Sequence, residues 1–260
     1  MKTAIAVRSL SFRYPDGTSA LTDVTFAVDT GECVGLLGPN GSGKSTLLRH
    51  LNGILPERLS AKESAVRIEG IAVTSANVAR VRVRTGLLFQ DPDDQLFCGT
   101  VREDVAFGPQ QLGLTPAEIE QRVEEALDQV GLAHLAHRPP HHLSTGEKRR
   151  ACLAGVLACA PGILVLDEPT SGLDPVASLN VEDAIIELRR AGKCVLLSTH
   201  MMYQAEELCD RLGVIGKGQM LAEGTIEEIL AQTGQPTLRK AFFHLVGHAP
   251  GAREDARAAT

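Results

Sequence analysis

The sequence predicts an α/β fold in which a mostly parallel β-sheet carries helices on both faces. An apolar run at 33–37 passes through a glycine-rich turn into a helical pattern at 46–51. A second apolar run, at 163–166, ends in two carboxylates, and strand and helix patterns alternate from residue 151 onward. Such alternation is typical of parallel sheets, because a helix usually connects one parallel strand to the next.

Residues 38–45 are the most informative stretch, because they fit the phosphate-binding P-loop, G-x-x-x-x-G-K-[ST], at every fixed position. Since a strand and a helix flank them, we prefer this interpretation to an ordinary glycine-rich turn. Backbone N–H groups of a P-loop cradle a polyphosphate at the helix N-terminus. Lys44 is expected to reach the β- and γ-phosphates, and Ser45 to offer a hydroxyl to Mg²⁺. The predicted nucleotide-binding residues of this loop are Gly38, Pro39, Asn40, Gly41, Ser42, Gly43, Lys44, Ser45 and Thr46.

Two carboxylates, Asp167 and Glu168, follow the apolar run at 163–166. The carboxyl end of a buried parallel strand is where ligands bind in open α/β sheets. Asp167 is expected to bind Mg²⁺ directly or through water, and Glu168 to hold and polarise an attacking water. The alternative, a pair of surface acids at the start of a loop, is disfavoured by the neighbouring P-loop.

The composition excludes several classes of protein. Of the 260 residues, 43% are apolar and 22% are charged, as in ordinary globular domains, and the net charge of −6 gives no basic surface for nucleic acid. There is no Trp and there are two Tyr, which disfavours a stacking platform for single strands. The six cysteines form no C-x-x-C pair, so we expect reduced thiols. The longest apolar stretch, 151–166, is interrupted by Pro161 and Gly162 and is too short to span a membrane.

The chain is expected to form a single domain at 1–230, followed by a tail at 231–260. Residues 3–35 indicate short strands of an N-terminal antiparallel β-subdomain, and residues 64–89 indicate further strands. A helical subdomain at about 91–150 is predicted as an insertion into the α/β core. The tail is weakly patterned, so we expect it to be weakly ordered.

Additional motifs follow one another in an order that resembles the ABC ATPase family. Residues 143–147, Leu-Ser-Thr-Gly-Glu, are similar to the family signature Leu-Ser-Gly-Gly-Gln. Tyr14, Gln90, Asp174 and His200 also stand where the family has functional residues of these types. Each motif alone is weakly specific, whereas their common order over residues 14 to 200 is highly specific. The resemblance implies the P-loop NTPase fold with a RecA-like core.

The resemblance also implies an ATPase that uses ATP and Mg²⁺ and works as a head-to-tail pair, for which a homodimer is sufficient. Each ATP would lie between the P-loop of one subunit and the signature of the other. Tyr14 would stack on adenine, while Ser144 and the N–H of Gly146 would contact the γ-phosphate from the second subunit. Asp174 would bridge the two halves. A core or edge-strand aromatic is the alternative for Tyr14.

Three residues are implied to be catalytic by the same resemblance, namely Glu168, His200 and Gln90. His200 would contact the γ-phosphate and help to hold the water, and Gln90 would sense the metal and the water. An ordinary loop histidine is the alternative for His200. The implied metal ligands are Ser45, Gln90 and Asp167.

The signature departs from the family pattern at two positions. Thr145 replaces a glycine, and a β-branched residue is disfavoured at positive φ, so either this position has ordinary dihedrals or the loop differs. Glu147 replaces glutamine and adds negative charge near a polyphosphate, unless a residue of 148–150 neutralises it. Histidines 134, 137, 141 and 142 lie nearby, but Pro139-Pro140 and the lack of a nearby acid favour a solvated loop over a metal site.

Residues 89–97 and 101–109 resemble the ATPases of energy-coupling factor importers, which take up vitamins, cobalt or nickel. Residues 148–150, Lys-Arg-Arg, and the short C-terminus look most like the cobalt/nickel branch. This resemblance implies a peripheral protein on the cytoplasmic face of the cell membrane. Its partners would be a transmembrane coupling subunit and a separate substrate-binding membrane subunit. A vitamin importer, such as one for biotin, stays open as an alternative.

Acidic residues after Gln90 offer a reason for such a partnership. In this family the groove at this segment receives helices that carry arginine, and Asp91, Asp93 and Asp94 would supply carboxylates for a guanidinium. A solvated acidic turn is the alternative. The other classes weighed are an exporter or binding-protein-dependent importer ATPase and a soluble ABC ATPase acting on DNA or ribosomes. The latter carries long insertions or two cassettes, whereas this chain has one P-loop and one signature.

Overall fold

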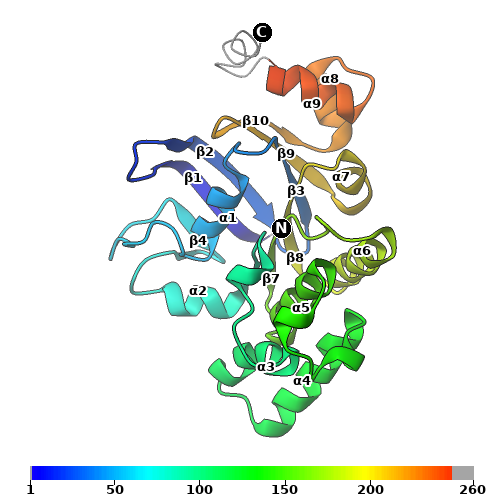
Figure 1. The fold of residues 1–260 in the computed structure, drawn as a ribbon. Coiled ribbons are helices and arrows are strands. Elements are labelled where there is room, and N and C mark those ends of the chain that lie inside the picture. The colour runs from blue at the N-terminus through cyan, green and yellow to red at the C-terminus, as the bar shows by residue number, and fades with distance from the viewer. Residues whose placement is uncertain (1, 248–260) are drawn as a thin grey trace.

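The central β-sheet of the molecule has the strand order β10-β9-β3-β8-β7-β6 (Figure 1). It belongs to a computed structural model that describes residues 2–247. Neighbouring strands from β9 to β6 pair in parallel, and β10 pairs antiparallel with β9. The prediction of a mostly parallel sheet is therefore confirmed. Its strands are β3 (Cys33–Leu37), β6 (Thr85–Leu88), β7 (Ile163–Asp167), β8 (Cys194–Thr199), β9 (Arg211–Gly216) and β10 (Gln219–Gly224).

Helices cover both faces of this sheet, as strands β3, β7 and β8 require, since all their residues are buried. Alternate residues of β7 point to opposite faces. Leu164 packs with helices α5 and α6, whereas Val165 packs with helix α1 on the other side. The helices of this core are α1 (Lys44–Leu51), α5 (Thr145–Ala158), α6 (Pro175–Arg190) and α7 (Met202–Leu208).

A second, antiparallel sheet with the order β2-β1-β4-β5 packs on the α1 side. Its strands are β1 (Thr3–Arg13), β2 (Ser19–Asp29), β4 (Val66–Ile68) and β5 (Ile71–Ala72). This confirms the predicted N-terminal β-subdomain. The strand expected toward residue 89 is wrong in part, because α2 (Val78–Arg84) is helical. Valine and arginine alternate there and imitate a strand, yet Val83 is exposed and Arg84 donates to Arg80 O one helical turn back.

The helical subdomain lies at one end of the molecule, opposite α8 and α9 (Figure 1). It consists of α3 (Val101–Gln111) and α4 (Pro116–Gln129), packed on α5 around a shared apolar cluster. Capping boxes begin α3 at Thr100 and α4 at Thr115. The regular helices begin about ten residues later than expected, because residues 91–100 form a short 3₁₀ turn (Pro92–Asp94) and a loop. Short 3₁₀ turns Ala133–Leu135 and Pro140–His142 lead into α5.

The C-terminal region differs from the weakly ordered tail that we expected. Helices α8 (Ile226–Thr233) and α9 (Leu238–Gly247) are packed against β9 and β10. Leu238, Ala241 and Phe242 are buried, with the i, i+3, i+4 spacing of one helix face. The prediction of weak order is thus wrong for 231–247, and residues 248–260 lie outside the described part. Within residues 2–247 no helix is long and apolar enough to cross a membrane.

Candidate active site

A cavity of about 290 Å³ lies at the P-loop, at the carboxyl ends of β3 and β7. Tyr14 forms part of one wall, residues 40–46 of the loop form the floor, and Gln90 and Glu168 close it. Residues 18–20, at the start of β2, complete the lining. The fold thus brings together predicted site residues that are up to 154 positions apart in the chain, since Glu168 and Tyr14 differ by 168 − 14.

The P-loop backbone needs glycine at defined positions. Gly41 and Gly43 have φ of 75° and 104°, which strains other residues. At Gly38 a Cβ atom would lie 2.5 Å from both Ile215 O and Ser42 Oγ. The Ser42 hydroxyl is buried and has no hydrogen-bond partner within the described residues. A backbone cradle with a spare buried hydroxyl at the start of α1 fits an oxygen-rich anion such as a polyphosphate.

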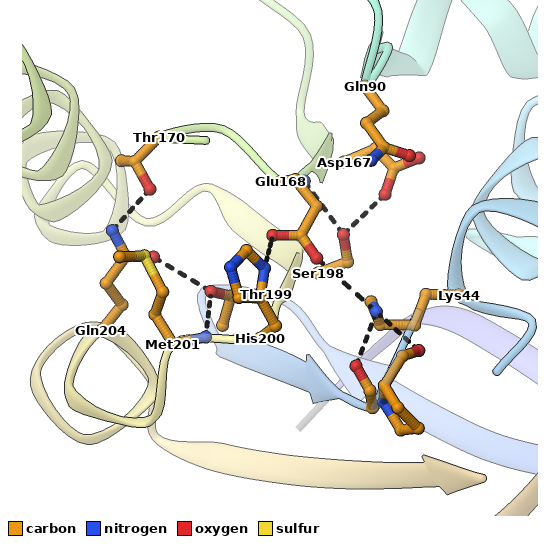
Figure 2. Close-up of polar contacts among 12 residues, drawn as sticks. Lys44, Gln90, Asp167, Glu168, Thr170, Ser198, Thr199, His200, Met201 and Gln204 are labelled. Carbon is orange, nitrogen blue, oxygen red and sulfur yellow. Dashed lines mark hydrogen bonds and ion pairs between the residues drawn. The ribbon is translucent and has the colours of Figure 1, made fainter. Parts of the chain in front are cut away.

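Lys44 is the cation of this loop and is almost completely buried. Its Nζ donates to Gly38 O at 2.7 Å and to Pro39 O at 3.3 Å, and it lies 3.5 Å from Glu168 Oε1 (Figure 2). A buried ammonium group needs such partners, because desolvation disfavours an unpaired charge. The side chain is therefore fixed beside the loop backbone, which is where a phosphate-binding lysine acts.

Glu168 joins the loop to the second half of the cavity. Its carboxylate lies between Lys44 and His200, whose Nδ1 is 2.7 Å from Oε2 (Figure 2). Because a carboxylate only accepts, the histidine donates this hydrogen bond. The backbone of Glu168 has φ of 52°, in the left-handed region, and its N–H donates to Ser198 O and Ser198 Oγ. Such strain persists where surrounding contacts hold it, often at functional sites.

Ser198 is a site residue that the sequence analysis missed. Its buried hydroxyl donates to Asp167 Oδ1 at 2.6 Å and accepts the Glu168 N–H at 3.0 Å. One side chain on β8 therefore orients both acids at the end of β7. The available signal was its position near the end of an apolar strand, where polar residues reach the ligand edge of the sheet.

Arg149 is a second residue whose place was not predicted. It is buried, and its guanidinium donates to Glu168 O and to Gln90 O. Burial lowers the pKa of Arg149, and the nearby carboxylates of Glu168 and Asp167 act against that shift. Its planar fork suits two acceptors at once. Arg149 thereby ties α5 to the backbone of the two residues that close the cavity.

The signature residues form the start of α5, and their structure explains both departures from the family pattern. Ser144 is the N-cap, and Thr145 is the first helical residue with ordinary dihedrals, so no glycine is required there. Glu147 closes a capping box, since Ser144 N donates to Glu147 Oε2 at 2.7 Å and Glu147 N donates to Ser144 Oγ at 3.3 Å. These bonds, followed by the charges of Arg138 and Arg150, lower the pKa of Glu147.

Of the three cations considered as possible neighbours of Glu147, Arg150 acts on it electrostatically, as does Arg138. Lys148 instead pairs with Asp93, with Nζ 2.6 Å from Oδ1. Arg149 is directed to the two backbone carbonyls described above. Successive residues on a helix point about 100° apart, so the side chains of Lys148, Arg149 and Arg150 reach different partners.

Seven predicted residues do not line the cavity formed by the described residues. Four of them adjoin residues that do: Gly38 and Pro39 bond to Lys44, His200 bonds to Glu168, and Asp167 precedes Glu168. The other three, Ser144, Gly146 and Asp174, stand at the starts of α5 and α6. Ser144 and Asp174 are exposed at the first turns of α5 and α6. Asp174 is an N-cap that accepts the N–H groups of Val176 and Ala177 at 3.0 Å each. These hydrogen bonds lower the pKa of its carboxyl group, which is therefore an anion on the surface.

Tyr14 lies across the cavity from Glu168 on the β-subdomain side. Its hydroxyl is 3.0 Å from Thr46 Oγ1, and its ring packs edge to face on Phe12 at 4.9 Å between centroids. Phe12 in turn packs on the buried His50 of α1. The tyrosine is thus held at the wall of the cavity by groups on both the strand and the P-loop helix.

Comparisons with known proteins agree with this geometry. A family model described as ABC transporter matches residues 21–171. The energy-coupling factor transporter ATP-binding protein EcfA of Methanocaldococcus jannaschii is 45% identical, over 93% of this chain and 85% of the relative. The chain therefore belongs to the ABC transporter family. Within it, this is an ATP-binding subunit of the energy-coupling factor type, a cassette that hydrolyses ATP with Mg²⁺.

Two solved structures have the same fold. The first is cbiO1 from Clostridium perfringens, described as part of the ABC transporter complex cbiONQ. It is 32% identical with a TM-score of 0.76, over 99% of this chain and all of that one (100%). The second is the ATP-binding cassette MJ0796, a dimer in a post-hydrolysis state bound to ADP and Pi. It is 26% identical with a TM-score of 0.77, over 85% of this chain and 98% of that one.

Proposed function

We propose that this subunit drives uptake of a transition metal ion, cobalt or nickel, through separate membrane subunits. Coupling to a membrane subunit is supported by a groove lined by Gln95, Phe97 and Phe107, which suits a helix of that subunit. Further support comes from the likeness to cbiO1, a component of the cbiONQ transporter complex. We also infer that the protein is peripheral, on the cytoplasmic face of the cell membrane.

For hydrolysis, we propose that Glu168 holds and polarises the attacking water. A carboxylate with Lys44 on one oxygen and His200 on the other keeps a fixed orientation, which proton transfer requires. His200 holds that carboxylate and reaches the γ-phosphate. Ser45, Gln90 and Asp167 are the proposed metal ligands. When bound, Mg²⁺ neutralises charge on the β- and γ-phosphates.

We propose that a second copy completes each site. Ser144 and Gly146 at the start of α5, together with Asp174, supply contacts that the cavity does not receive from its own chain. Support comes from their location at helix N-termini, where N–H groups favour anions. It also comes from the dimeric form of the related cassette MJ0796.

The proposed docking groove has a volume of about 380 Å³ and lies between the segment after Gln90, α3 and α5. Phe97 and Phe107 line it, with 67% and 41% of their surfaces exposed, and they pack edge to face at 4.9 Å. Exposed aromatic residues of this kind mark binding surfaces. The occupant that we propose is an amphipathic helix of the membrane coupling subunit.

The charged residues that line the groove are Asp104 and Arg82, and the acids at 91–94 stand beside it, just before the lining residue Gln95. Of these neighbouring acids, Asp94 is the one we propose for an ion pair with the docking helix. Asp93 is already paired with Lys148, and Asp91 accepts the N–H of Asp93. Asp94 is exposed and has no ion pair with another described residue. We therefore expect Asp94 to receive the arginine of the docking helix. Asp94→Asn should weaken co-purification of the coupling subunit, whereas nucleotide binding by the isolated subunit persists.

Affinity purification from detergent-solubilised membranes of the source organism, followed by mass spectrometry, tests the transport proposal. Recovery of an integral-membrane scaffold together with a metal-binding membrane protein would support it. A vitamin-binding partner would keep the importer and replace the substrate. Partners from ribosomes or DNA, or a purely soluble protein, would contradict it.

A further inference from the structure

Four buried polar side chains, each on a different element, meet next to the loops that carry Glu168 and His200. They are Thr170 in the loop after β7, Glu182 on α6, Thr199 at the end of β8 and Gln204 on α7. Their exposed fractions are 5%, 6%, 1% and 2%. Buried polar groups destabilise the fold unless they are hydrogen-bonded, so such a cluster requires a specific arrangement.

Gln204 bonds to all three other members of this cluster, and Figure 2 shows it with Thr170 and Thr199. Its Nε2 donates to Glu182 Oε1 at 2.8 Å and to Thr170 Oγ1 at 2.5 Å, and its Oε1 accepts from Thr199 Oγ1 at 3.0 Å. The Thr199 hydroxyl in turn accepts the N–H of Met201 at 3.0 Å. Because the Glu182 carboxylate only accepts, the amide nitrogen must face it, and the direction of every bond follows.

These bonds link the two halves of the proposed hydrolytic pair. Thr170 is two residues after Glu168, and Thr199 is the residue before His200. Glu168 and His200 contact each other at 2.7 Å, so a ring of contacts passes through both loops and closes at Gln204. Since Glu168 has a strained backbone with φ of 52°, its placement depends on what holds the adjoining residues.

The same amide also reaches α6, the helix that Asp174 begins. Glu182 lies two turns into α6, and Leu173 N donates to Thr170 O at 3.2 Å within the connecting loop. The loop 168–174 is therefore anchored through its third residue and through the helix that follows it. A shift of Asp174 at the proposed dimer contact would be transmitted to Thr170 through the same hydrogen bonds.

We propose that Gln204 is a positioning residue for ATP hydrolysis. It fixes the relative positions of Glu168 and His200, and it links those positions to Asp174 at the end of the loop 168–174. Gln204 does not line the cavity, so it acts through its neighbours. This inference rests on the proposed roles of Glu168 and His200. The inference depends on which side chain donates and which accepts, and these roles can be exchanged between positions 182 and 204.

The decisive variants exchange that pattern. Gln204→Glu places a second carboxylate against Glu182, so the Nε2 donor is lost and two buried acids repel. Glu182→Gln combined with Gln204→Glu returns a donor to the pair, because the new amide at 182 can donate to the new carboxylate at 204. Both threonine hydroxyls can also donate to that carboxylate. The matched control is Glu207→Gln, which changes a charge on the exposed face of the same helix.

The expected result is a loss of turnover without a loss of nucleotide binding. Gln204→Glu should lower kcat about tenfold or more, with the Kd for ATP of the isolated chain unchanged, and the double variant should recover to within about threefold of the parent. Turnover by Gln204→Glu relative to the parent should increase as the pH falls, because protonation of one acid relieves the repulsion. Glu207→Gln should match the parent.

Several outcomes would overturn the inference. These are parental kcat in Gln204→Glu, a double variant no better than the single one, and a parallel fall of kcat, ATP affinity and Tm, which indicates general destabilisation. If Gln204→Glu does not fold, Gln204→Met gives the same readouts, and parental kcat there counts equally against the inference. Glu168→Gln is assayed alongside. Turnover retained by Glu168→Gln would refute the proposed hydrolytic roles. If Glu168→Gln loses turnover but the Gln204 variants do not behave as expected, only the positioning role of Gln204 is refuted.

Discussion

The two ends of the proposed ATP site are constructed differently. At the P-loop end, Lys44 and Glu168 are buried and hydrogen-bonded to other parts of the same chain. At the signature end, Ser144 and Asp174 are exposed, and among residues 2–247 their side chains bond to the first turn of their own helices. A single chain can therefore hold the P-loop end of the site in place. The signature end does not contact the cavity formed by the described residues of its own chain.

The buried end of the site is therefore formed when the chain folds, whereas the exposed end is available for dimer assembly. The buried half is stabilised by core packing and needs no partner to hold its geometry. The exposed half consists of capped helix ends, which are stable as local structures in isolated chains. A dimer can then open and close without unfolding either half, because its contacts come from preformed surfaces.

The largest expected effect is at the buried end. Glu168→Gln should lower kcat about a thousandfold, because a general base of this kind contributes about that much. The Kd for ATP should remain close to the parental value, since Lys44 and the loop backbone are unchanged. Phosphate release and equilibrium ATP binding measure the two quantities, and parental turnover would remove Glu168 from the proposed role.

The next prediction tests whether the two ends act across a dimer. Lys44→Ala and Ser144→Arg should each lose most of their turnover when assayed alone, the first by loss of the cation and the second by obstruction of the signature. An equal mixture should recover about a quarter of parental sites, because half of randomly formed dimers contain one intact pair of ends. Activity is measured against mixing ratio. No recovery, with dimers present, would contradict a site shared between chains.

Arg149 connects α5 with the buried end, and its substitution should have an intermediate effect. Arg149→Lys keeps the charge but cannot donate to Glu168 O and Gln90 O together, since lysine lacks the planar fork. We expect kcat to fall about tenfold, which corresponds to about 1.4 kcal/mol of transition-state stabilisation. Steady-state kinetics measures this, with Lys148→Arg as the control on the same helix.

The smallest effect is expected at the exposed end. Glu147→Gln preserves the capping box but removes a charge near a helix N-terminus, at a cost of about 0.5 kcal/mol or about 1–2 °C in Tm. The pKa of Glu147 is lower in the folded state, so its stabilisation is present above the unfolded pKa and is lost as the pH falls through the folded pKa. The two Tm values should therefore converge in acid. A constant difference from neutral to acid pH would contradict this.

Several features of the fold were predictable from neighbouring residues. The P-loop, the α/β alternation and the acids at the end of β7 each depend on local sequence, because strand and helix periods and glycine turns are local properties. The errors have equally local causes. At α2 a valine–arginine alternation imitated a strand, and in the C-terminal region the spacing of Leu238, Ala241 and Phe242 was overlooked.

The sequence by itself determined which backbone could bind phosphate and which side chains carry negative charge at the sheet edge. Only the tertiary structure decided which side chains hold them. Arg149 bonds to carbonyls 19 and 59 residues away, and Ser198 and Gln204 bond to partners 31 and 34 residues away. Such contacts leave no periodic signal, because they arise only when buried polar groups from separate elements must satisfy one another.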